Sequence, residues 1–282
     1  VFIICTGLTV FVAHSLGPWL SEWLKWIFAL ILAIVGADIG KNHKWRYIIL
    51  ALIASGVANA IVGTYIFLGG SGADHFRISG HFFRAFGTFE QPNPFGGFMG
   101  LLAPIALMMA YGYFWLNIDR WRKSRSISLS SFAYLSFYTF SAGLLALGVI
   151  ISWSRGAWLS FGVSMGVIVI ALPRKWWHSI GIAALSLMLL GLLWTSGRIP
   201  TSVVDRIESA GRDIISVKDI RGVDITTENY AVTERLAHWQ AATNMLSHEF
   251  WLGVGFGNYE AVYNDYRLIN WKEPLGHAHN YY

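Results

Sequence analysis

The sequence predicts an all-α protein, a polytopic transmembrane helical bundle with a mainly helical extracytoplasmic loop domain. Of its 282 residues, 55% are hydrophobic and only 13% are charged, whereas a soluble domain carries about a quarter charged residues. Charged side chains are absent from five long stretches, and each can hold the roughly 20 apolar residues that cross a bilayer. These stretches are 47–73, 91–118, 126–154, 156–173 and 176–197. A buried helix of a soluble protein could resemble one of them, but five in one chain indicate a membrane protein.

Two earlier segments bring the expected number of membrane segments to seven. Residues 1–13 are typical of a helix cut at its start, because no basic region precedes the apolar run, so we expect a fragment rather than a signal peptide. Residues 19–39 are a weaker segment, with Lys25 and Asp38 near its ends, where long side chains can reach the interface. The seven segments are 1–13 (partial), 19–39, 47–68, 95–116, 132–152, 157–172 and 178–197. We expect 1–197 to form the transmembrane bundle and 198–282 an extracytoplasmic loop domain, truncated at its end.

The distribution of basic residues predicts the orientation. Three alternate loops, 40–46, 117–131 and 173–177, contain nine Lys and Arg residues. The short loops on the opposite side contain three arginines, which are Arg77, Arg84 and Arg155. The positive-inside rule places the richer loops in the cytoplasm. The net charge of +5 therefore reflects membrane topology, and no nucleic-acid partner is expected. Cys5 is the only cysteine, so no disulfide within this chain is expected.

The region after residue 197 reads as a loop followed by two helices. Residues 198–225 are loop-like, and Thr227 can cap a helix that starts at Glu228. Apolar positions then recur at helical spacing; they are Val232, Leu236, Trp239, Thr243 and Leu246. A turn with Gly253, Gly255 and Gly257 precedes a second short helix over 258–266. No strand precedes these glycines, so a nucleotide-binding loop is not favoured.

Several polar residues could form a site or have ordinary structural roles. Arg155, in a short turn at the rim of the bundle, is either functional or an anchor for lipid phosphates. Arg84 faces the same side, and Asn93 before Pro94 predicts a capped helix start. Arg235 lies one residue off the apolar stripe and, taken alone, fits a solvated helix face.

The chain closes with Gly276-His277-Ala278-His279-Asn280. Either histidine could act as a general base, because an unperturbed imidazole titrates near pH 6.5. A zinc site is not favoured, since no third ligand has a recognisable spacing.

Four motifs in this order, with matching sidedness, resemble the O-antigen ligase family and its relatives, the O-antigen polymerases and protein O-oligosaccharyltransferases. The motifs are Gly87-Thr88-Phe89 with Pro92-Asn93-Pro94-Phe95, Ser154-Arg155-Gly156-Ala157-Trp158-Leu159, Glu234-Arg235-Leu236 with Trp239-Gln240-Ala241-Ala242 and Trp251-Leu252-Gly253-Val254-Gly255-Phe256-Gly257-Asn258-Tyr259, and Gly276-His277-Ala278-His279-Asn280. The resemblance spans about residues 80–282. Glu90-Gln91 departs from the Gly-Asn pair expected there, and family members usually have further helices on both sides.

The resemblance implies a glycosyltransferase, of the kind that serves lipopolysaccharide biosynthesis, in the bacterial inner membrane with its active site on the extracytoplasmic face. Its donor would be a glycan linked to undecaprenyl pyrophosphate, and its acceptor the hydroxyl of a glycan, lipid or protein. Arg155 and Arg235, with Arg84 as a third, would hold the pyrophosphate. His279 would be the general base, with His277 and Asn280 orienting it or the acceptor.

Neither a cofactor nor a metal is expected, because arginines can take the place of a metal at the phosphates. The alternative is an inorganic-anion (bicarbonate-like) transporter of the same family. It is less favoured because a transporter site calls for charged or broken helices at mid-membrane, and the five clean segments contain no charge. A scaffold without enzymatic activity is also less favoured, since it gives no reason for arginines and a terminal histidine to converge.

Overall fold

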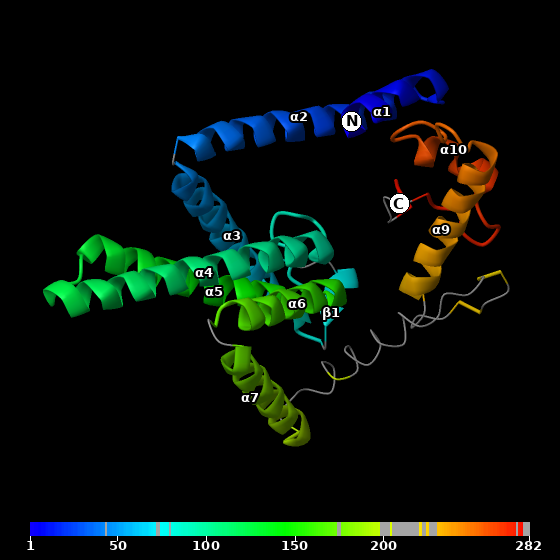
Figure 1. Ribbon diagram of the computed structural model, residues 1–282. Coiled ribbons are helices and arrows are strands. Elements are labelled where there is room, and N and C mark those ends of the chain that lie inside the picture. Colours follow the sequence, from blue (N-terminus) through cyan, green and yellow to red (C-terminus); the bar gives the residue numbers. More distant parts are fainter. Residues whose placement is uncertain are drawn as a thin grey trace. The chain divides into compact units, whose positions relative to one another are not determined.

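A computed structural model describes residues 1–42, 44–71, 74–78, 80–173, 176–197, 204, 220–221, 224–225, 230–274 and 276–278 (Figure 1). Almost all of the secondary structure in these ranges is helical. The helices are α1 (Phe2–Leu8), η1 (Thr9–Val12), α2 (Leu16–Lys41), α3 (Trp45–Phe67), η2 (Asp74–Phe76), α4 (Pro92–Ser124), α5 (Leu129–Ile151), α6 (Arg155–Ala171), α7 (Trp176–Thr195), α9 (Tyr230–His248) and α10 (Tyr259–Tyr266). The one sheet in these ranges is a two-stranded antiparallel hairpin of β1 (Arg77–Ile78) and β2 (Phe82–Phe83).

All seven predicted membrane segments contain helix. Four helices, α2 to α5, are long and apolar enough to cross a bilayer, and the apolar helices over 2–12, 155–171 and 177–189 are shorter. The fold class is confirmed: this is an all-α, multi-pass membrane protein. That the three shorter segments also cross the membrane stays a prediction.

The chain divides into two compact units, which are described separately below. The bundle unit comprises Trp45–Ala210, and the terminal unit comprises Val1–Lys44 together with Gly211–Tyr282.

The bundle unit is built around the long hairpin of α4 and α5, which run side by side with α3 and α6 packed against them (Figure 1). Small residues let these helices approach closely, as is common in membrane bundles. A Cβ atom at Gly63 of α3 would lie 2.5 Å from the ring of Phe95, and one at Gly148 of α5 would lie 2.9 Å from Met99. The core therefore depends on glycine at its crossing points as much as on its large apolar side chains.

The helix α4 begins earlier than the Asn93-Pro94 pair predicts. Its first residue is Pro92, which is buried, and Gln91 precedes it in extended conformation without a side-chain cap. The expectation that Asn93 caps this helix is therefore wrong. Pro92 takes the first helical position, where proline is favoured.

In the terminal unit, α9 packs on α10, but through a different stripe from the one predicted. The buried positions are Thr233, Ala237, His238, Ala241 and Met245. Trp239 and Leu246, which the periodicity placed inside, are 39% and 53% exposed. Small side chains on α9 leave room for the large ones of α10, where Val262 and Tyr263 are buried. The predicted second helix is confirmed by α10, whereas Thr227 and Glu228 lie outside the described residues.

The glycines before α10 bring its N-terminal loop against the start of α2. Gly255 and Gly257 have φ of 94° and 73°, and a Cβ atom at Gly257 would lie 2.7 Å from the carbonyl oxygen of Pro18. Asn258 is fully buried, and its Oδ1 accepts a hydrogen bond from the Ser15 amide at 2.6 Å. These glycines thus serve chain packing in this structure, in line with the rejection of a nucleotide loop.

Candidate functional site

Two of the predicted arginines belong to the same end of the bundle unit, near the β1–β2 hairpin (Figure 1): Arg84 donates to the carbonyl oxygen of Ser152, and Arg155 begins α6 three residues later. We call this place the arginine corner and define it by Arg84, Asn93, Ser152, Ser154 and Arg155. It is formed where α5 ends and where α4 and α6 begin. Both arginines are half-buried.

Hydrogen bonds hold the Arg84 side chain and the backbone of the next residue at the corner. The Nε group donates to the carbonyl oxygen of Ser152 at 3.2 Å, and Nη2 donates to Oδ1 of Asn93 at 3.2 Å. The following amide, of Ala85, donates to the carbonyl oxygen of Ile151 at 2.9 Å. The guanidinium also lies over the ring of Phe76, 5.9 Å from its centroid. Asn93 therefore orients an arginine instead of capping a helix.

Arg155 is the first residue of α6, and Ser154 is the N-cap. The Ser154 hydroxyl accepts from the Ala157 amide at 3.5 Å, and the fully buried Ser152 hydroxyl accepts from the Ser154 amide at 3.2 Å. Trp153 between them has a φ of 55°, a conformation that costs energy in a non-glycine residue. The turn is held in this shape by its hydrogen bonds, and it fixes where Arg155 leaves the backbone.

The N-termini of α4 and α6 lie close together at this corner. A Cβ atom at Gly96, in the first turns of α4, would lie 2.6 Å from Oγ of Ser152 and 2.8 Å from Cβ of Ala157. A helix N-terminus carries partial positive charge and favours anions. Two such termini, the guanidinium group of Arg84 and an arginine at the start of α6 make the arginine corner chemically suited to a phosphate-containing ligand.

The loop with Gly87 and Thr88, part of the first motif, is tied to the membrane helix α3. Thr88 donates from its amide at 3.2 Å and from its hydroxyl at 2.7 Å to Oδ1 of Asn59. Gly87 has a φ of 55°, and a Cβ atom there would lie 2.8 Å from the Phe95 ring. Sequence reasoning did not single out Asn59, although a polar residue within an apolar helix is a signal that could have found it.

The remaining predicted site residues belong to the terminal unit. Arg235 lies on α9 and is exposed, and His277 is exposed in the segment after Trp271. His279 and Asn280 lie outside the described residues. The structure thus places Arg84 beside the turn that precedes Arg155, and the roles of all six predicted site residues stay predictions.

A residue that sequence reasoning missed is His238, three residues after Arg235 on α9. Its side chain is 1% exposed, and its Nδ1 lies 2.7 Å from the hydroxyl of Tyr259. Its ring lies 5.2 Å from that of Tyr263. Burial lowers the pKa of His238 below its ordinary value, and the nearby His277 lowers it further. Burial also raises the pKa of Tyr259. His238 is therefore a neutral, structural histidine near the motif that contains His277.

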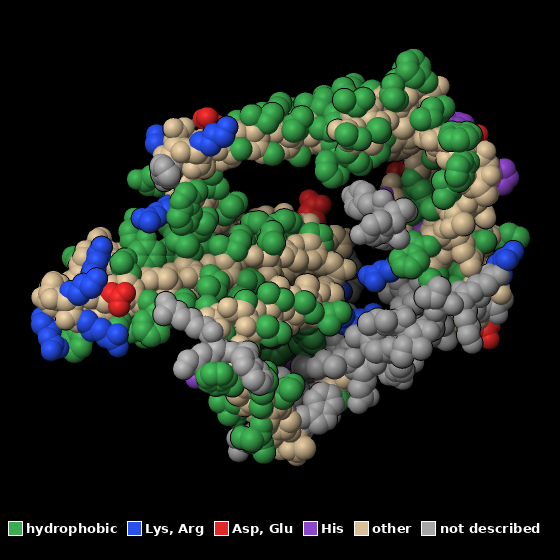
Figure 2. Space-filling view, viewed as in Figure 1, with side chains coloured by type: hydrophobic (Ala, Val, Ile, Leu, Met, Phe, Trp, Pro, Cys, Tyr) green, Lys and Arg blue, Asp and Glu red, His purple; other side chains and the backbone are tan. Residues whose placement is uncertain are grey.

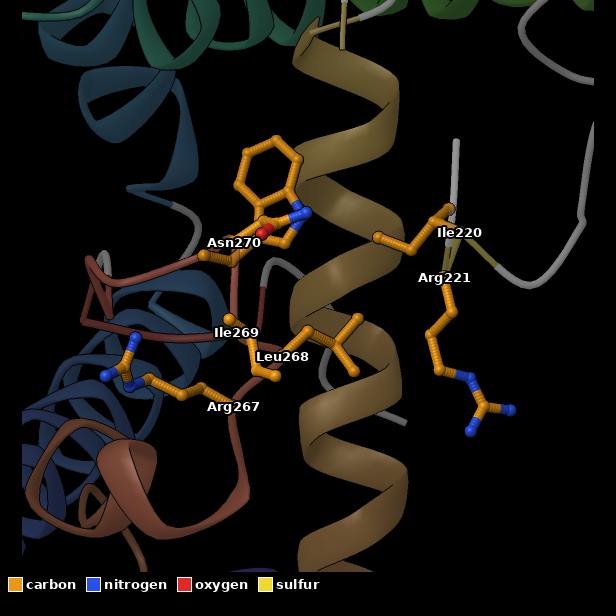
Figure 3. A pocket seen from close by; sticks show the side chains of 7 residues that line it. Ile220, Arg221, Arg267, Leu268, Ile269 and Asn270 are labelled. Carbon is orange, nitrogen blue, oxygen red and sulfur yellow. The ribbon is translucent and has the colours of Figure 1, made fainter. Parts of the chain in front are cut away.

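A cavity of about 330 Å³ lies beside α9 and is lined by two arginines. Ile220 and Leu268 belong to the cluster that packs on Ala237 and Trp271. Figure 3 shows that the side chains of Arg221 and Arg267 point to opposite sides, so their guanidinium groups do not converge on one ligand. This cavity therefore does not replace the arginine corner as the candidate phosphate site.

Comparison with known proteins supplies the decisive observation. The family model for O-antigen ligase matches residues 140–282. The chain belongs to the O-antigen ligase family. Searches of curated proteins and of solved structures gave no match.

Membership in the O-antigen ligase family makes this chain a membrane glycosyltransferase of the ligase or polymerase type, which acts on lipid-linked glycans at the bilayer. The matched region contains Arg155, Arg235, His277, His279 and Asn280. Arg84 precedes this region, but its hydrogen bond to Ser152 attaches it to the matched part. In the part of the chain that the structure describes, no three His, Cys, Asp or Glu side chains are grouped as metal ligands; metal independence stays a prediction.

Proposed function

We propose that this chain transfers a glycan from undecaprenyl pyrophosphate to an acceptor hydroxyl on the extracytoplasmic face of the bacterial inner membrane. The observation that carries the proposal is the arginine corner, where Arg84 is bonded to the carbonyl of Ser152 and Arg155 begins α6. Such a corner suits a leaving group with two phosphates at a membrane surface. The acceptor is a glycan, a lipid or a protein.

Arg155 and Arg235 hold the departing pyrophosphate, with Arg84 as a third contact. The planar guanidinium group donates two parallel hydrogen bonds to phosphate oxygens, which Lys cannot do. Negative charge grows on the bridging oxygen as the bond to the anomeric carbon breaks. Cationic and helix-terminal groups placed there stabilise the transition state more than the bound donor. Support comes from the two hydrogen bonds that hold Arg84 in place and from the capped start of α6.

His279 accepts the proton of the acceptor hydroxyl as its oxygen attacks the anomeric carbon. The bond from that carbon to the pyrophosphate oxygen breaks in the same step, so the lipid pyrophosphate leaves with the electron pair. His277 and Asn280 orient His279 or the acceptor. A positioned general base contributes about 10²–10⁴ in rate.

The test is His279→Gln in the full-length gene product, assayed in membranes with a lipid-linked donor. Glutamine keeps a similar volume and some hydrogen bonding but accepts no proton. Transfer should fall at least about 100-fold, while membrane insertion and donor binding persist. His277→Gln is the matched control and should be milder. Full transfer in the double variant would rule out a histidine base, and loss only in His277→Gln would assign the base to the other histidine. Transfer should also survive EDTA, and loss on chelation with recovery on adding a divalent ion would contradict the arginine roles.

A further inference from the structure

A groove lies between α4 and α5 near their connecting loop, in the bundle unit. It has a volume of about 310 Å³ and an almost wholly apolar wall. The wall is formed by Phe114, Ile118, Trp121, Ile127, Phe132 and Leu135, together with Asn117. Because α4 starts at the arginine corner and runs 33 residues to Ser124, this groove is at the opposite end of the hairpin and is separate from the proposed glycosyl-transfer site.

Asn117 links the two helices beside this groove. Its side chain is 5% exposed, and Nδ2 donates to the carbonyl oxygen of Ser131 at 3.4 Å. Its Oδ1 and the Ser131 hydroxyl have no hydrogen-bond partner among the described residues. Both atoms are closed off from solvent, so they are not open to a ligand in the groove, and the Asn117–Ser131 hydrogen bond joins α4 to α5 at this depth.

Basic side chains surround the end of the groove next to the loop. Figure 2 shows Lys and Arg side chains gathered at this end of the hairpin. They are Arg120, Arg122, Lys123 and Arg125, and all are exposed. Arg125 is held over the ring of Trp121, 4.5 Å from its centroid, and Trp121 itself lines the groove. The helix advances 1.5 Å per residue, so the positive charge lies about one to two turns beyond Asn117.

We propose that this groove binds one anionic glycerophospholipid. An acyl chain lies along Phe114, Ile118 and Leu135, and the phosphate contacts Arg125 and its basic neighbours. The apolar wall and the basic residues at its loop end match the order of acyl chain and phosphate in such a lipid. The charge complementarity selects anionic over zwitterionic lipid.

The experiment measures lipid binding to the intact chain, purified in detergent and stripped of lipid. Native mass spectrometry follows titration with phosphatidylglycerol or phosphatidylcholine in mixed micelles. We expect one phosphatidylglycerol to bind more tightly than phosphatidylcholine. Arg125→Gln should weaken phosphatidylglycerol about fivefold, the effect of one basic residue near an anionic lipid. Ile118→Trp should fill the groove and abolish the tight site; Ile127→Trp, on an exposed loop position, does the same if the first variant fails to fold.

Arg46→Gln is the matched control. Arg46 lies over the ring of Trp45 at 5.4 Å and belongs to the same unit, but neither residue lines the groove. The proposal is wrong if phosphatidylcholine binds equally well, if Arg46→Gln weakens binding as much as Arg125→Gln, or if both tryptophan variants keep the tight site. Displacement of the lipid by inorganic phosphate alone would also overturn it, because that would indicate an anion site without a role for the acyl chain. The lipid test changes no residue of the arginine corner, so either proposal can fail without the other.

Discussion

The arginine corner and the α9–α10 pair hold their arginines by different means. At the corner, Arg84 and Arg155 lie where three apolar helices meet, and glycine at position 96 allows the close approach. On α9, Arg235 is exposed, and the helix beneath it packs on α10 through Ala241 and Met245 and through the contact of buried His238 with the Tyr259 hydroxyl. The first region depends on packing in an apolar bundle. The second combines a small apolar cluster with a hydrogen bond that involves a histidine, whose protonation depends on pH.

If both regions serve one reaction, they must lie on the same side of the membrane. The largest expected effect is therefore an all-or-none difference in thiol labelling. In a Cys5→Ser background, a thiol reagent that cannot cross the membrane should modify Ser247→Cys of α9 in intact cells. Ser124→Cys, at the far end of α4, should react only after permeabilisation. Both positions are exposed, so reactivity reports sidedness. The reverse pattern would remove the proposed orientation and the reaction with it.

The next largest effect concerns the arginine fork. Arg155→Lys keeps the charge but loses the two parallel hydrogen bonds, so glycan transfer should fall about 100-fold, as when one donor to a developing anion is lost. Arg46→Lys, exposed in the first turn of α3, is the control and should transfer normally. If Arg155→Lys and Arg155→Ala both transfer near the normal rate, Arg155 is only a membrane anchor.

A pair of adjacent glycines tests whether packing holds the corner. A Cβ at Gly96 meets Ser152 and Ala157, whereas one at Gly97 meets nothing within 4 Å. Gly96→Ala should destabilise the bundle by about 1–3 kcal/mol through overpacking and lower transfer, because Ser152 holds Arg84. Gly97→Ala should be neutral or slightly stabilising, since alanine favours helix. Thermal unfolding in detergent and the transfer assay measure both. Equal stability of the two variants would mean that α4 can move away from Ser152 and Ala157 without destabilising the bundle.

Sequence patterns located the membrane helices but predicted neither their full lengths nor their contacts. Uncharged apolar runs predicted α3 to α7, because a bilayer demands long apolar helices whatever they pack against. The helix α4 nevertheless continues to Ser124 through charged residues of the predicted loop 117–131. The same logic failed on α9. Hydrophobic periodicity selects the largest apolar residues, such as Trp239 and Leu246. Instead, α9 packs through Ala241 on Val262 and Tyr263 and through Ala237 on Ile220 and Trp271. Which face of α9 is buried depends on the side chains that pack against it, and the periodicity of α9 alone carries no information about them.

For the candidate site, too, the sequence predicted the placement of residues but not their contacts. The sequence predicted that Arg84 and Arg155 share a side of the membrane, because topology alone gives sidedness. It did not predict the bond from Arg84 to Ser152, which joins residues 68 positions apart, or the use of Asn93 as its partner. His238 was missed because a lone histidine in an amphipathic helix has no spacing signal. Only its burial beside Tyr259 and Tyr263 distinguishes it.

The smallest expected effect is a pH dependence confined to the terminal unit. Burial, and then His277, lowers the pKa of His238 from its ordinary value of 6.5. Below that value the unfolded chain binds a proton that the folded chain excludes, so stability falls as pH falls through 6.5 toward the folded pKa. Hydrogen exchange of α9 and α10 peptides should therefore quicken between pH 7.5 and 5.5, after correction for intrinsic rates, while peptides from α4 to α6 stay unchanged. His238→Gln should remove this dependence, and His248→Gln, exposed at the end of the same helix, should keep it. An equal response in both units, or an unchanged slope in His238→Gln, would show that His238 does not set the pH sensitivity of this region.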